Sequence, residues 1–425
     1  MRTMALLLGL AVAAGALWSC AGGTGSNAGA DLDSMWADTL SPYLADDQWV
    51  ADYRYDAGHF LMVPLHYAYA AGLPDWQAAF ADQFSRFTAT DIESIDLSFG
   101  EQLGWTQYLY LASRFCVLAE GTGQVPEGLE AALLDCVLRI WLEEPAVSYT
   151  GESFTGRRGL ALWRLSTHEV EYSYYRAIQD VELHVFAIAG DLAQLYRARG
   201  LDVRASIVDI LDVAQAAFEQ EVAWGDDGGW LLQPGVWTDH PDYEYAGRTA
   251  EVPGMDPLPV PGIASDSSHA HRLARWLCSL RDAGSAGDPR YDMYQRLVAG
   301  LATQLTRHAL VPPSDGRRLY LVTNYVDGWN GVYRWGYGDD PDDGYGPYEL
   351  SGTWLLGWWA FLGDPEVQTA YRQSAACFPL TDDEVQLVWG WYLDHPRVRH
   401  PLIADVAAIR PGGLLQLDCT LAGRL

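Results

Sequence analysis

The sequence predicts an all-α fold, a closed ring of five or six helical hairpins that forms an α/α toroid with its long loops on one rim. Apolar segments with helical spacing recur along the chain, and short turns with Gly or Pro join them in pairs. Strand-type alternation is scarce outside residues 317–322. The pairs follow one another in series, so we expect one domain over residues 46–425. A helical solenoid is the competing fold, but the pairs share no fixed repeat period.

Each predicted pair has an apolar first helix and a second helix with a polar face. Residues 58–71 and 350–362 are apolar nearly all round, which is typical of inner helices. Residues 214–221 and 295–307 carry polar faces, as outer helices do. A lead-in helix, or two, is expected within residues 31–54. The predicted pairs are 58–71 with 75–87, 99–118 with 126–142, 174–199 with 203–222, 265–282 with 290–310, 348–362 with 366–377, and a shortened pair, 383–393 with 403–409.

The composition limits the partners of the protein. The net charge is −29 at pH 7, and all 27 basic residues are arginines because the chain contains no lysine. A protein this acidic has no basic stripe that would neutralise phosphates, which argues against nucleic acid. The 18 Trp and 24 Tyr residues suit the flat faces of sugar rings, although most of them are expected to fill the core. A glycan or oligosaccharide is therefore the expected partner.

The N-terminus predicts export. Residues 5–18 form an apolar run, too short to span a membrane, between a positive start and Ser19-Cys20. This arrangement resembles the bacterial lipoprotein signal over residues 1–20. The resemblance implies that Cys20 is lipidated and anchors the protein in the cell envelope, at its periplasmic or surface face. Ordinary secretory cleavage near Ala21 is the alternative. Residues 21–45 predict a flexible tether and lead-in, so the membrane is expected to be contacted only through the lipid.

The remaining cysteines do not predict a disulfide framework or a metal cluster. They are odd in number and lie in apolar helical segments. Two alternatives remain: a disulfide bridge from Cys116 to Cys136 across one hairpin, or free buried thiols. The five residues are Cys116, Cys136, Cys278, Cys377 and Cys419.

Three long loops interrupt the helical pairs, at residues 144–173, 224–263 and 323–347. Each of them leads from an outer helix to the next inner helix. In a ring of hairpins these connections lie on the same rim, and long irregular loops in compact proteins are often functional. We therefore expect the functional site on that rim, near the N-terminal ends of the inner helices.

The series of paired helices and the aromatic loops resemble the six-hairpin glycosidase superfamily. The resemblance covers residues 46–425 and rests on architecture, without a diagnostic motif. The superfamily includes glycoside hydrolases, sugar epimerases and several polysaccharide lyases, so the resemblance implies activity on carbohydrate within the toroid cleft. Because one fold hosts many functions, the site must decide among these reactions.

The best functional lead is the start of the fourth inner helix, residues 265–277. Ser265 or Asp266 is expected to cap this helix with a side-chain oxygen. Asp266, His269, Arg272 and Trp276 follow at helical spacing and share one face. An acid, an imidazole and a guanidinium at the open end of an apolar helix make a polar site. The alternative is a capping Asp, a His at the rim of the core and a solvated Arg.

Other inner helices also bring polar residues to the predicted rim. Acids at helix N-termini are often only caps, because the helix dipole favours negative charge there, so convergence on one rim supports the site. The candidate catalytic residues are Asp266, His269, Glu349 and Glu101. The candidate substrate-binding residues are Arg272, Arg176, His240, Tyr243, Trp230, Trp237, Trp329 and Trp335.

Two reaction types fit these residues, and hydrolysis is our first hypothesis. Inverting hydrolysis needs two carboxyl groups on opposite sides of the bond, one protonated and one that activates water. Further candidates for this pair are Asp180, Glu182, Asp239 and Asp242. A lyase or epimerase instead needs a His or Tyr base and an Arg that neutralises a uronate. The residues that fit these roles are His269, His240, Tyr243, Arg176 and Arg272.

Two alternatives without catalysis remain. A glycan-binding lipoprotein on the same scaffold would use the four candidate tryptophans and would not need the acids. A helical scaffold for another envelope protein would need an exposed apolar patch. We expect no metal, because His269 and His271 stand two apart and point about 200° apart on a helix. We expect no cofactor, because the Gly-rich stretches carry no Lys and no phosphate-loop spacing. The acidic run at residues 339–343 lacks the ligand spacing of a calcium loop. The expected state is a monomer.

Overall fold

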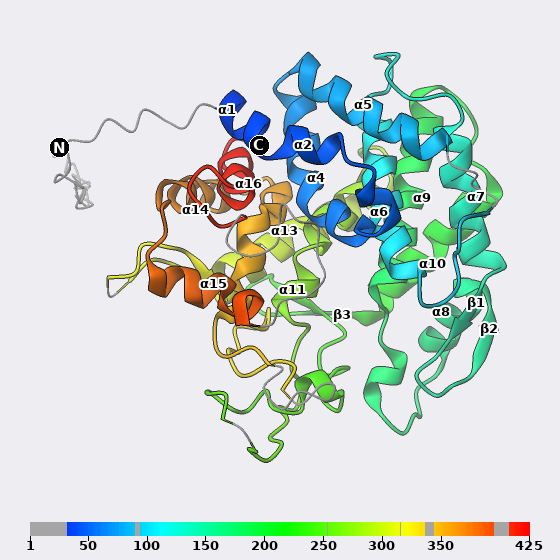
Figure 1. Cartoon of the computed structure of the whole chain (residues 1–425). Helices are drawn as coiled ribbons and strands as arrows, with labels where there is room; N and C mark the ends of the chain where they lie inside the picture. The colour runs from blue at the N-terminus through cyan, green and yellow to red at the C-terminus, as the bar shows by residue number, and fades with distance from the viewer. Residues whose placement is uncertain (1–31, 90–93, 253, 315, 336–343, 395–407) are drawn as a thin grey trace, which may run out of the picture.

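The computed structural model describes residues 32–89, 94–252, 254–314, 316–335, 344–394 and 408–425. These residues are predominantly helical, with three short two-stranded sheets, so the all-α prediction is confirmed (Figure 1). Three short helices lead in, α1 (Leu32–Asp38), α2 (Leu40–Leu44) and α3 (Gln48–Ala51). Helix α1 packs against both α2 and the last helix, α16 (Leu414–Ala422), so the two ends of the described chain lie side by side.

The first four predicted pairs are confirmed as adjacent helices. Their inner members contain long runs of buried apolar residues, which explains why the sequence there lacks a polar face. The pairs are α4 (Arg54–Ala70) with α5 (Pro74–Ala89), α6 (Gln102–Leu118) with α7 (Leu129–Leu142), α9 (Asp180–Ala198) with α10 (Ala205–Glu221), and α12 (Leu273–Asp282) with α13 (Pro289–Gln304). A separate turn of helix, α11 (Ser267–Ala270), precedes α12.

The inner helices contact one another in series. Helix α4 packs on α6, α6 on α9, α9 on α12, and α12 on the 3₁₀ segment η6 (Trp358–Leu362). Helix α16 contacts the preceding 3₁₀ segment, η5 (Glu349–Leu356), and also α4, so the series returns to its first helix. The apolar residues of these elements form one large buried cluster.

The fifth predicted pair differs from expectation at its inner member. Residues 348–362 were expected as one α-helix, but they form η5 and η6, separated by Gly357. Gly357 has φ = 82°, and a Cβ at this position would lie 2.9 Å from the Cβ of Ala422. The close approach of α16 and the left-handed backbone therefore break the helix at this glycine. The outer member is confirmed as α14 (Pro365–Ala376).

The end of the chain was only partly predicted. Helix α15 (Asp382–Asp394) matches the expected 383–393, and it packs on η5. The expected helix at 403–409 lies mostly outside the described residues. Helix α16 was missed, although Gly412 and Gly413 precede an apolar run there that packs between α4 and α14.

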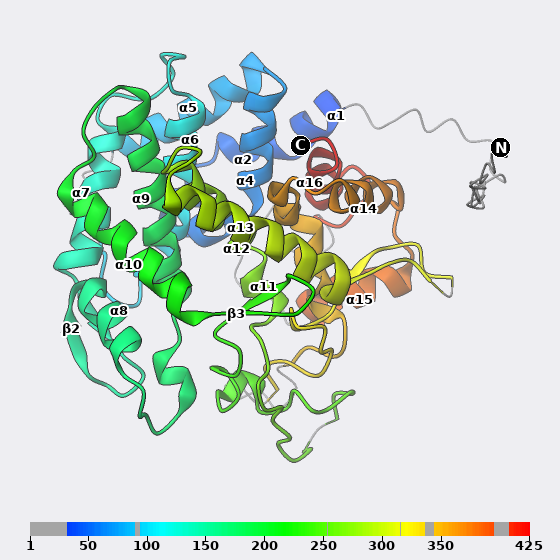
Figure 2. The ribbon, with the colours of Figure 1, turned by 180° about the vertical axis from the view of Figure 1, so that it is seen from behind.

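The described parts of the three long loops gather at the lower end of the molecule in both views (Figures 1 and 2). The first loop is more regular than predicted, because it holds a helix, α8, whose buried face packs on α7 and α10. Residues 317–322 form only a two-residue strand. The short elements are β1 (Pro145–Val147), β2 (Ser153–Thr155), α8 (Gly156–Ser166), η2 (Ser173–Arg176), β3 (Val222–Trp224), β4 (Trp230–Leu232), η3 (Pro241–Tyr243), η4 (Leu305–Ala309), β5 (Leu310–Val311) and β6 (Leu321–Val322).

The five cysteines of the helical part are all free and buried, so the Cys116–Cys136 bridge is not formed. Burial raises the pKa of the Cys136 thiol to about 12, as for an inert core thiol. Within the part of the chain that the structure describes, no helix has both the length and the apolar character to cross a membrane.

Candidate functional site

Asp266 caps the first turn of α11, as the sequence predicts. Its carboxylate accepts a hydrogen bond from the backbone N–H of His269 at 3.1 Å. The residue also forms a bridge to Tyr325 in the third loop, which ties the start of α11 to that loop. Asp266 therefore caps α11 at the point where this helix contacts the third loop.

The same carboxylate holds the His269 side chain. Oδ2 of Asp266 lies 2.8 Å from Nδ1 of His269, and the hydroxyl of Tyr243 donates to Oδ2 at 2.7 Å. Ser268 donates a third side-chain hydrogen bond, to Oδ1. Burial alone would raise the pKa of Asp266, but the charge of His269 and these hydrogen bonds hold it well below the usual range. Asp266 is therefore a buried partner of the imidazole whose ionised form is favoured.

His269 keeps its other ring nitrogen accessible. Its side chain is 45% exposed, and Nε2 makes no hydrogen bond with any residue that the structure describes. Burial opposes protonation of the ring, but the charges of Asp266 and Asp180 raise the pKa of His269 above its ordinary value. The imidazole is thus oriented by one nitrogen and free to exchange a proton through the other.

A cavity of about 400 Å³ lies in front of His269. It is formed by the N-terminal ends of α6, α9, α11 and α12 together with the loops, on the predicted rim. Apolar and aromatic side chains make most of its wall, and a few polar groups converge on it, as in small-molecule sites. Residues that line it include Phe99, Leu103, Tyr149, Arg157, Gln179, Asp180, Trp237, His240, Asp242, Tyr243, Asp266, His269, Trp276 and Tyr333.

Asp242 is the second titratable group of the cavity with a displaced pKa. Burial, opposed by the charges of Arg334 and His269, raises the pKa of Asp242 to about 6. Nε of Arg334 lies 3.7 Å from its Oδ1, and the Tyr333 hydroxyl donates to Oδ2 at 3.4 Å. Oδ1 is buried and has no hydrogen-bond partner among the described residues. A carboxyl group in this state is poised to take up or release a proton near neutral pH.

The aromatic wall is built by the second loop. The rings of Trp237 and Tyr243 stack at a centroid distance of 5.7 Å and an interplanar angle of 10°. His240 packs edge-on against Trp237, and its Nδ1 accepts the backbone N–H of Asp242 at 3.1 Å. Burial and the charge of His269 lower the pKa of His240 to about 4, so the ring is neutral at neutral pH. His240 and Tyr243 both line the cavity, and they also hydrogen-bond the backbone of Asp242 and the carboxylate of Asp266, respectively.

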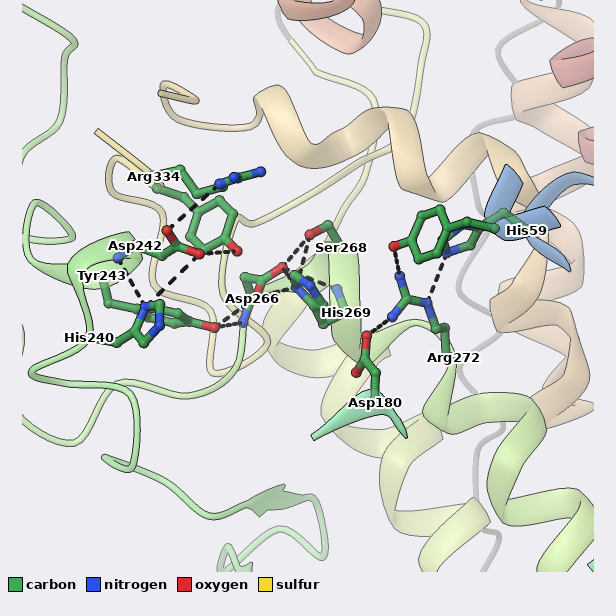
Figure 3. A network of polar contacts seen from close by, with 12 residues as sticks. His59, Asp180, His240, Asp242, Tyr243, Asp266, Ser268, His269, Arg272 and Arg334 are labelled. Atoms are coloured by element: carbon green, nitrogen blue, oxygen red, sulfur yellow. Dashed lines mark hydrogen bonds and ion pairs between the residues drawn. The ribbon is translucent and has the colours of Figure 1, made fainter. Parts of the chain in front are cut away.

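Arg272 occupies the far side of His269 (Figure 3). It forms an ion pair with Asp180 at the start of α9, and its Nε donates to Nε2 of His59 in α4 at 2.9 Å. Its Nη2 donates to the hydroxyl of Tyr55 at 2.6 Å. Arg272 is 1% exposed. Its contacts connect the start of α12 with α9 and α4 at the rim.

Three other predicted site residues lie outside the cavity. Glu101 is 44% exposed and forms an ion pair with Arg54. Glu349 accepts the backbone N–H of Gly346 at 2.8 Å and begins η5. Nη2 of Arg176 donates to Glu221 at 3.2 Å. None of these three residues lines the cavity in front of His269, and each is held by a local ion pair or backbone contact instead.

Of the four candidate tryptophans, only Trp237 lines the cavity. Trp230 is 1% exposed, and its Nε1 donates to the carbonyl of Leu297 in the core. Trp335 is buried against Tyr245. Trp329 is partly exposed, but its Nε1 is held by the carbonyl of Ala246. In this structure protein covers the rings of Trp230 and Trp335, so neither ring presents a face to the cavity.

The sequence interpretation missed Tyr333 and Tyr149 and gave Asp242 only as one of several carboxylates. Tyr333 comes from the third loop, and nothing in its neighbouring residues indicates that it reaches Asp242. Cys20 and the acidic run at 339–343 lie outside the described residues. Among the residues that are described, no group of three or more His, Cys, Asp or Glu side chains is arranged to hold a metal ion.

Comparison of the chain with protein-family models, with curated proteins and with solved structures finds no match. The site must therefore be interpreted from its own chemistry.

Proposed function

We propose that this protein is an exported, lipid-anchored carbohydrate-active enzyme that hydrolyses a glycosidic bond in the cavity in front of His269. One observation carries the proposal. His269, whose pKa is raised above its ordinary value, and Asp242, whose pKa is raised to about 6, line the same cavity of about 400 Å³ with aromatic walls. Two titratable groups whose environments move their pKa values differently mark the acid and the base of a site.

The two pKa shifts support different roles. The pKa of Asp242 is about 6, so Asp242 is ionised above that pH, and the raised pKa of His269 favours its doubly protonated ring. We assign Asp242 as the general base, and His269 as the general acid in place of the second carboxyl group that the sequence analysis expected. Asp266 keeps Nδ1 of His269 bound, so that Nε2 carries the proton that is transferred.

The reaction balances with water as the only co-substrate. Asp242 takes one proton from a water molecule, and the water oxygen forms a bond with the anomeric carbon. The bond from that carbon to the glycosidic oxygen breaks, and Nε2 of His269 protonates the departing oxygen. The two products are a sugar with a new hydroxyl group and a shortened glycan. Proton exchange with solvent restores Asp242 and His269.

The walls of the cavity favour a glycan as the substrate. Trp237, Tyr149 and Phe99 present apolar surfaces at a site whose centre is polar, and sugar rings combine apolar faces with hydroxyl edges. Phe99 and Tyr149 are exposed at the cavity mouth. Such exposed aromatic residues around a cavity are typical of ligand sites.

The arrangement of the inner helices supports the α/α toroid. Their contacts run from α4 through α6, α9 and α12 to η6, and α16 contacts both η5 and α4. The cavity lies where their N-terminal ends converge, as expected for the six-hairpin glycosidase superfamily that the sequence resembles. We propose a monomer that reaches the membrane only through a lipid on Cys20. Loss of lipid labelling in the Cys20→Ala variant would test the anchor.

The test of the enzyme is turnover of a panel of neutral and acidic glycans by the full chain. We expect a new reducing end with at least one glycan, and its formation should fall strongly in both Asp242→Asn and His269→Gln variants. A ligand that raises the melting temperature but is never converted would indicate the glycan-binding alternative. If folded protein neither converts nor binds any member, the carbohydrate proposal is wrong.

A lyase is the second candidate, favoured by the position of Tyr333. Its hydroxyl lies beside Asp242, and the residue lines the cavity next to His269. In that reaction neutral His269 removes a carbon-bound proton beside a uronate, and Tyr333 protonates the departing oxygen. Elimination yields an unsaturated product without uptake of water. Its rate would rise with pH through the pKa of His269, whereas hydrolysis with His269 as acid would decline there.

A further inference from the structure

A buried arginine, Arg157, lines the cavity in front of His269 but has no part in the proposed reaction. It lies near the N-terminal end of α8 and is 2% exposed. Its Nε donates to the side-chain oxygen of Gln102 at 2.7 Å, and its Nη1 donates to Glu182 at 3.1 Å. Its Nη2 makes no hydrogen bond with any residue that the structure describes, and it is not fully enclosed by protein. This nitrogen is therefore available to a molecule in the cavity.

The positive charge of Arg157 is only partly balanced by its carboxylate partner. Glu182 is shared with a second buried arginine, Arg164, whose Nη1 lies 3.0 Å from the same Oε1. The further hydrogen-bond partners of the two guanidinium groups among the described residues, Gln102 and Gln179, are neutral amides. Two buried guanidinium groups thus share one negative charge, which leaves one positive charge in surplus. Because a buried charge without a counter-charge is costly, an anion bound beside Arg157 would be stabilised.

The carboxylates that line the cavity do not supply the missing counter-charge. Each of them lies beside a basic group of its own. The pairs are Asp180 with Arg272, Asp242 with Arg334, and Asp266 with His269. The start of α9 adds to the positive potential, because residues 178–181 line the cavity and the N-terminal end of a 19-residue helix favours negative charge. The surplus is thus a local feature of a chain whose net charge is −29.

The size of the surplus favours a singly charged anionic group. A carboxylate or a sulfate ester carries one negative charge at neutral pH and offers oxygen acceptors to a guanidinium N–H. A phosphate monoester carries about 1.5 to 2 negative charges, more than the surplus. The ring of Phe99 lies 5.2 Å from Cζ of Arg157 and is 46% exposed at the cavity mouth. A sugar that brings its anionic group to Nη2 would therefore also find an apolar surface beside it.

We propose that Arg157 forms an anion subsite in this cavity, so that the enzyme acts on an acidic glycan whose sugar carries a carboxylate or a sulfate ester. This inference rests on the proposed glycosidase activity and assigns the substrate class within it. Arg157 binds the anionic group and determines specificity, whereas proton transfer stays with His269 and Asp242. Bound substrate then completes the charge balance of the two buried arginines.

The first test compares matched sugars on the full chain by calorimetry. The probes are the methyl glycosides of glucose, galactose and mannose, those of the corresponding uronic acids, and the 6-sulfates of the three hexosides. We expect at least one acidic sugar to bind about tenfold more tightly than its neutral counterpart. The stronger of the uronic acid and the sulfate identifies the anionic group. If the wild type binds no acidic sugar more tightly than the neutral counterpart, the anion subsite is wrong.

The second test assigns the preference to Arg157. Arg157→Gln leaves Glu182 with Arg164 as its single charged partner, so the buried charges balance and the variant should fold. The ratio of acidic to neutral affinity should fall to about one, because the amide carries no charge. Arg158→Gln is the matched control, since it removes the same charge from the same helix at a residue that pairs with Asp209 and does not line the cavity. A preference retained in folded Arg157→Gln, or lost equally in Arg158→Gln, would overturn the assignment.

The subsite and the glycosidase fail separately. Hydrolysis of a neutral glycan, without an Arg157-dependent preference for its acidic counterpart, would remove the subsite and keep the glycosidase. An Arg157-dependent preference in binding, without turnover of any acidic glycan, would keep the subsite and remove the glycosidase.

Discussion

Oδ2 of Asp266 lies 2.8 Å from Nδ1 of His269, one helical turn further along the chain. The pair joins a helix cap to a proton-transfer group, because the carboxylate that binds the N–H of the first turn also binds the imidazole. Asp266 is 1% exposed, so it acts through His269 and is a positioning residue. What Asp266 contributes is measurable as the pKa of His269.

The Asp266→Asn variant should move the alkaline limb of the pH profile to lower pH. A carboxylate within hydrogen-bond distance raises the pKa of a histidine by about one unit or more, and the neutral amide does not. We therefore expect the fall in kcat/KM with rising pH to begin about one pH unit earlier than in the wild type. An unmoved limb, with reduced kcat, would show that His269 is not the acid.

The acid limb should belong to Asp242. Because Asp242 acts in its ionised form, kcat/KM should be lost as the pH falls through about 6, where this carboxyl group takes up a proton. The Asp242→Asn variant should abolish this limb and reduce kcat/KM by about 10²–10⁴-fold. A profile from pH 4.5 to about 9 on both proteins measures the effect. Retention of the limb in the variant would assign it to another group.

The contacts of the site between residues close in sequence were predicted, whereas the contacts between distant residues were missed. Asp266 and His269 are three residues apart, so helical spacing alone places them together. Tyr243 reaches Asp266 from 23 residues away, and Tyr333 reaches Asp242 from 91 residues away. Both contacts depend on how long loops fold over the rim, which spacing does not encode. The same limit explains Trp230, whose sequence neighbourhood resembles a loop although its side chain is in the core.

The helices were easier to predict, because period and turn residues are local signals. The predicted type of helix was wrong where tertiary packing determines the backbone conformation. At Gly357, for example, α16 approaches too closely for a side chain. Helix α8 was missed because its buried face is narrow and includes Arg157 and Arg164. Glu182 of α9 pairs with both arginines, and Gln102 and Gln179 accept further hydrogen bonds from them.

Two tryptophans should separate ligand binding from stability. Trp237→Ala removes an aromatic face of the cavity, so affinity for the glycan should fall while the free energy of unfolding changes little. Trp230→Ala should lower the free energy of unfolding by about 3–5 kcal/mol, because it leaves a large hole in the core. Calorimetric binding and urea unfolding on both variants provide the comparison. Unchanged affinity in folded Trp237→Ala would remove this residue from the site.

Glu182 should be far more important for stability than Glu101. Glu182 is fully buried, and Arg157 and Arg164 lie 3.1 and 3.0 Å from its Oε1. Glu182→Gln leaves two buried guanidinium groups without their counter-charge, which should lower the free energy of unfolding by about 3–5 kcal/mol. Glu101→Gln, in an exposed pair with Arg54, should cost less than about 1 kcal/mol. Equal effects in urea unfolding would contradict this difference.

Asp418 in α16 is a buried acid whose carboxyl group makes no hydrogen bond with the described residues. Its side chain is 0% exposed, and neither carboxylate oxygen has a hydrogen-bond partner among the residues described. Burial raises the pKa of Asp418 well above its ordinary value. The folded protein therefore holds a proton here that the unfolded chain releases above about pH 4. The folded protein therefore favours the neutral form of this side chain, and ionisation of Asp418 would destabilise the fold.

Asp418→Asn should consequently stabilise the protein, and the gain should grow with pH. Below about pH 4 both states of the wild type are protonated, and an amide replaces a neutral acid with little effect. Above that pH the wild type loses about 1.4 kcal/mol of unfolding free energy per pH unit until the folded pKa is reached, whereas the variant does not titrate. Urea unfolding of both proteins at about pH 4, 5.5 and 7 measures the widening difference. A difference that stays constant, or a variant that becomes less stable as the pH rises, would mean that the carboxylate is ionised and partnered in the folded protein.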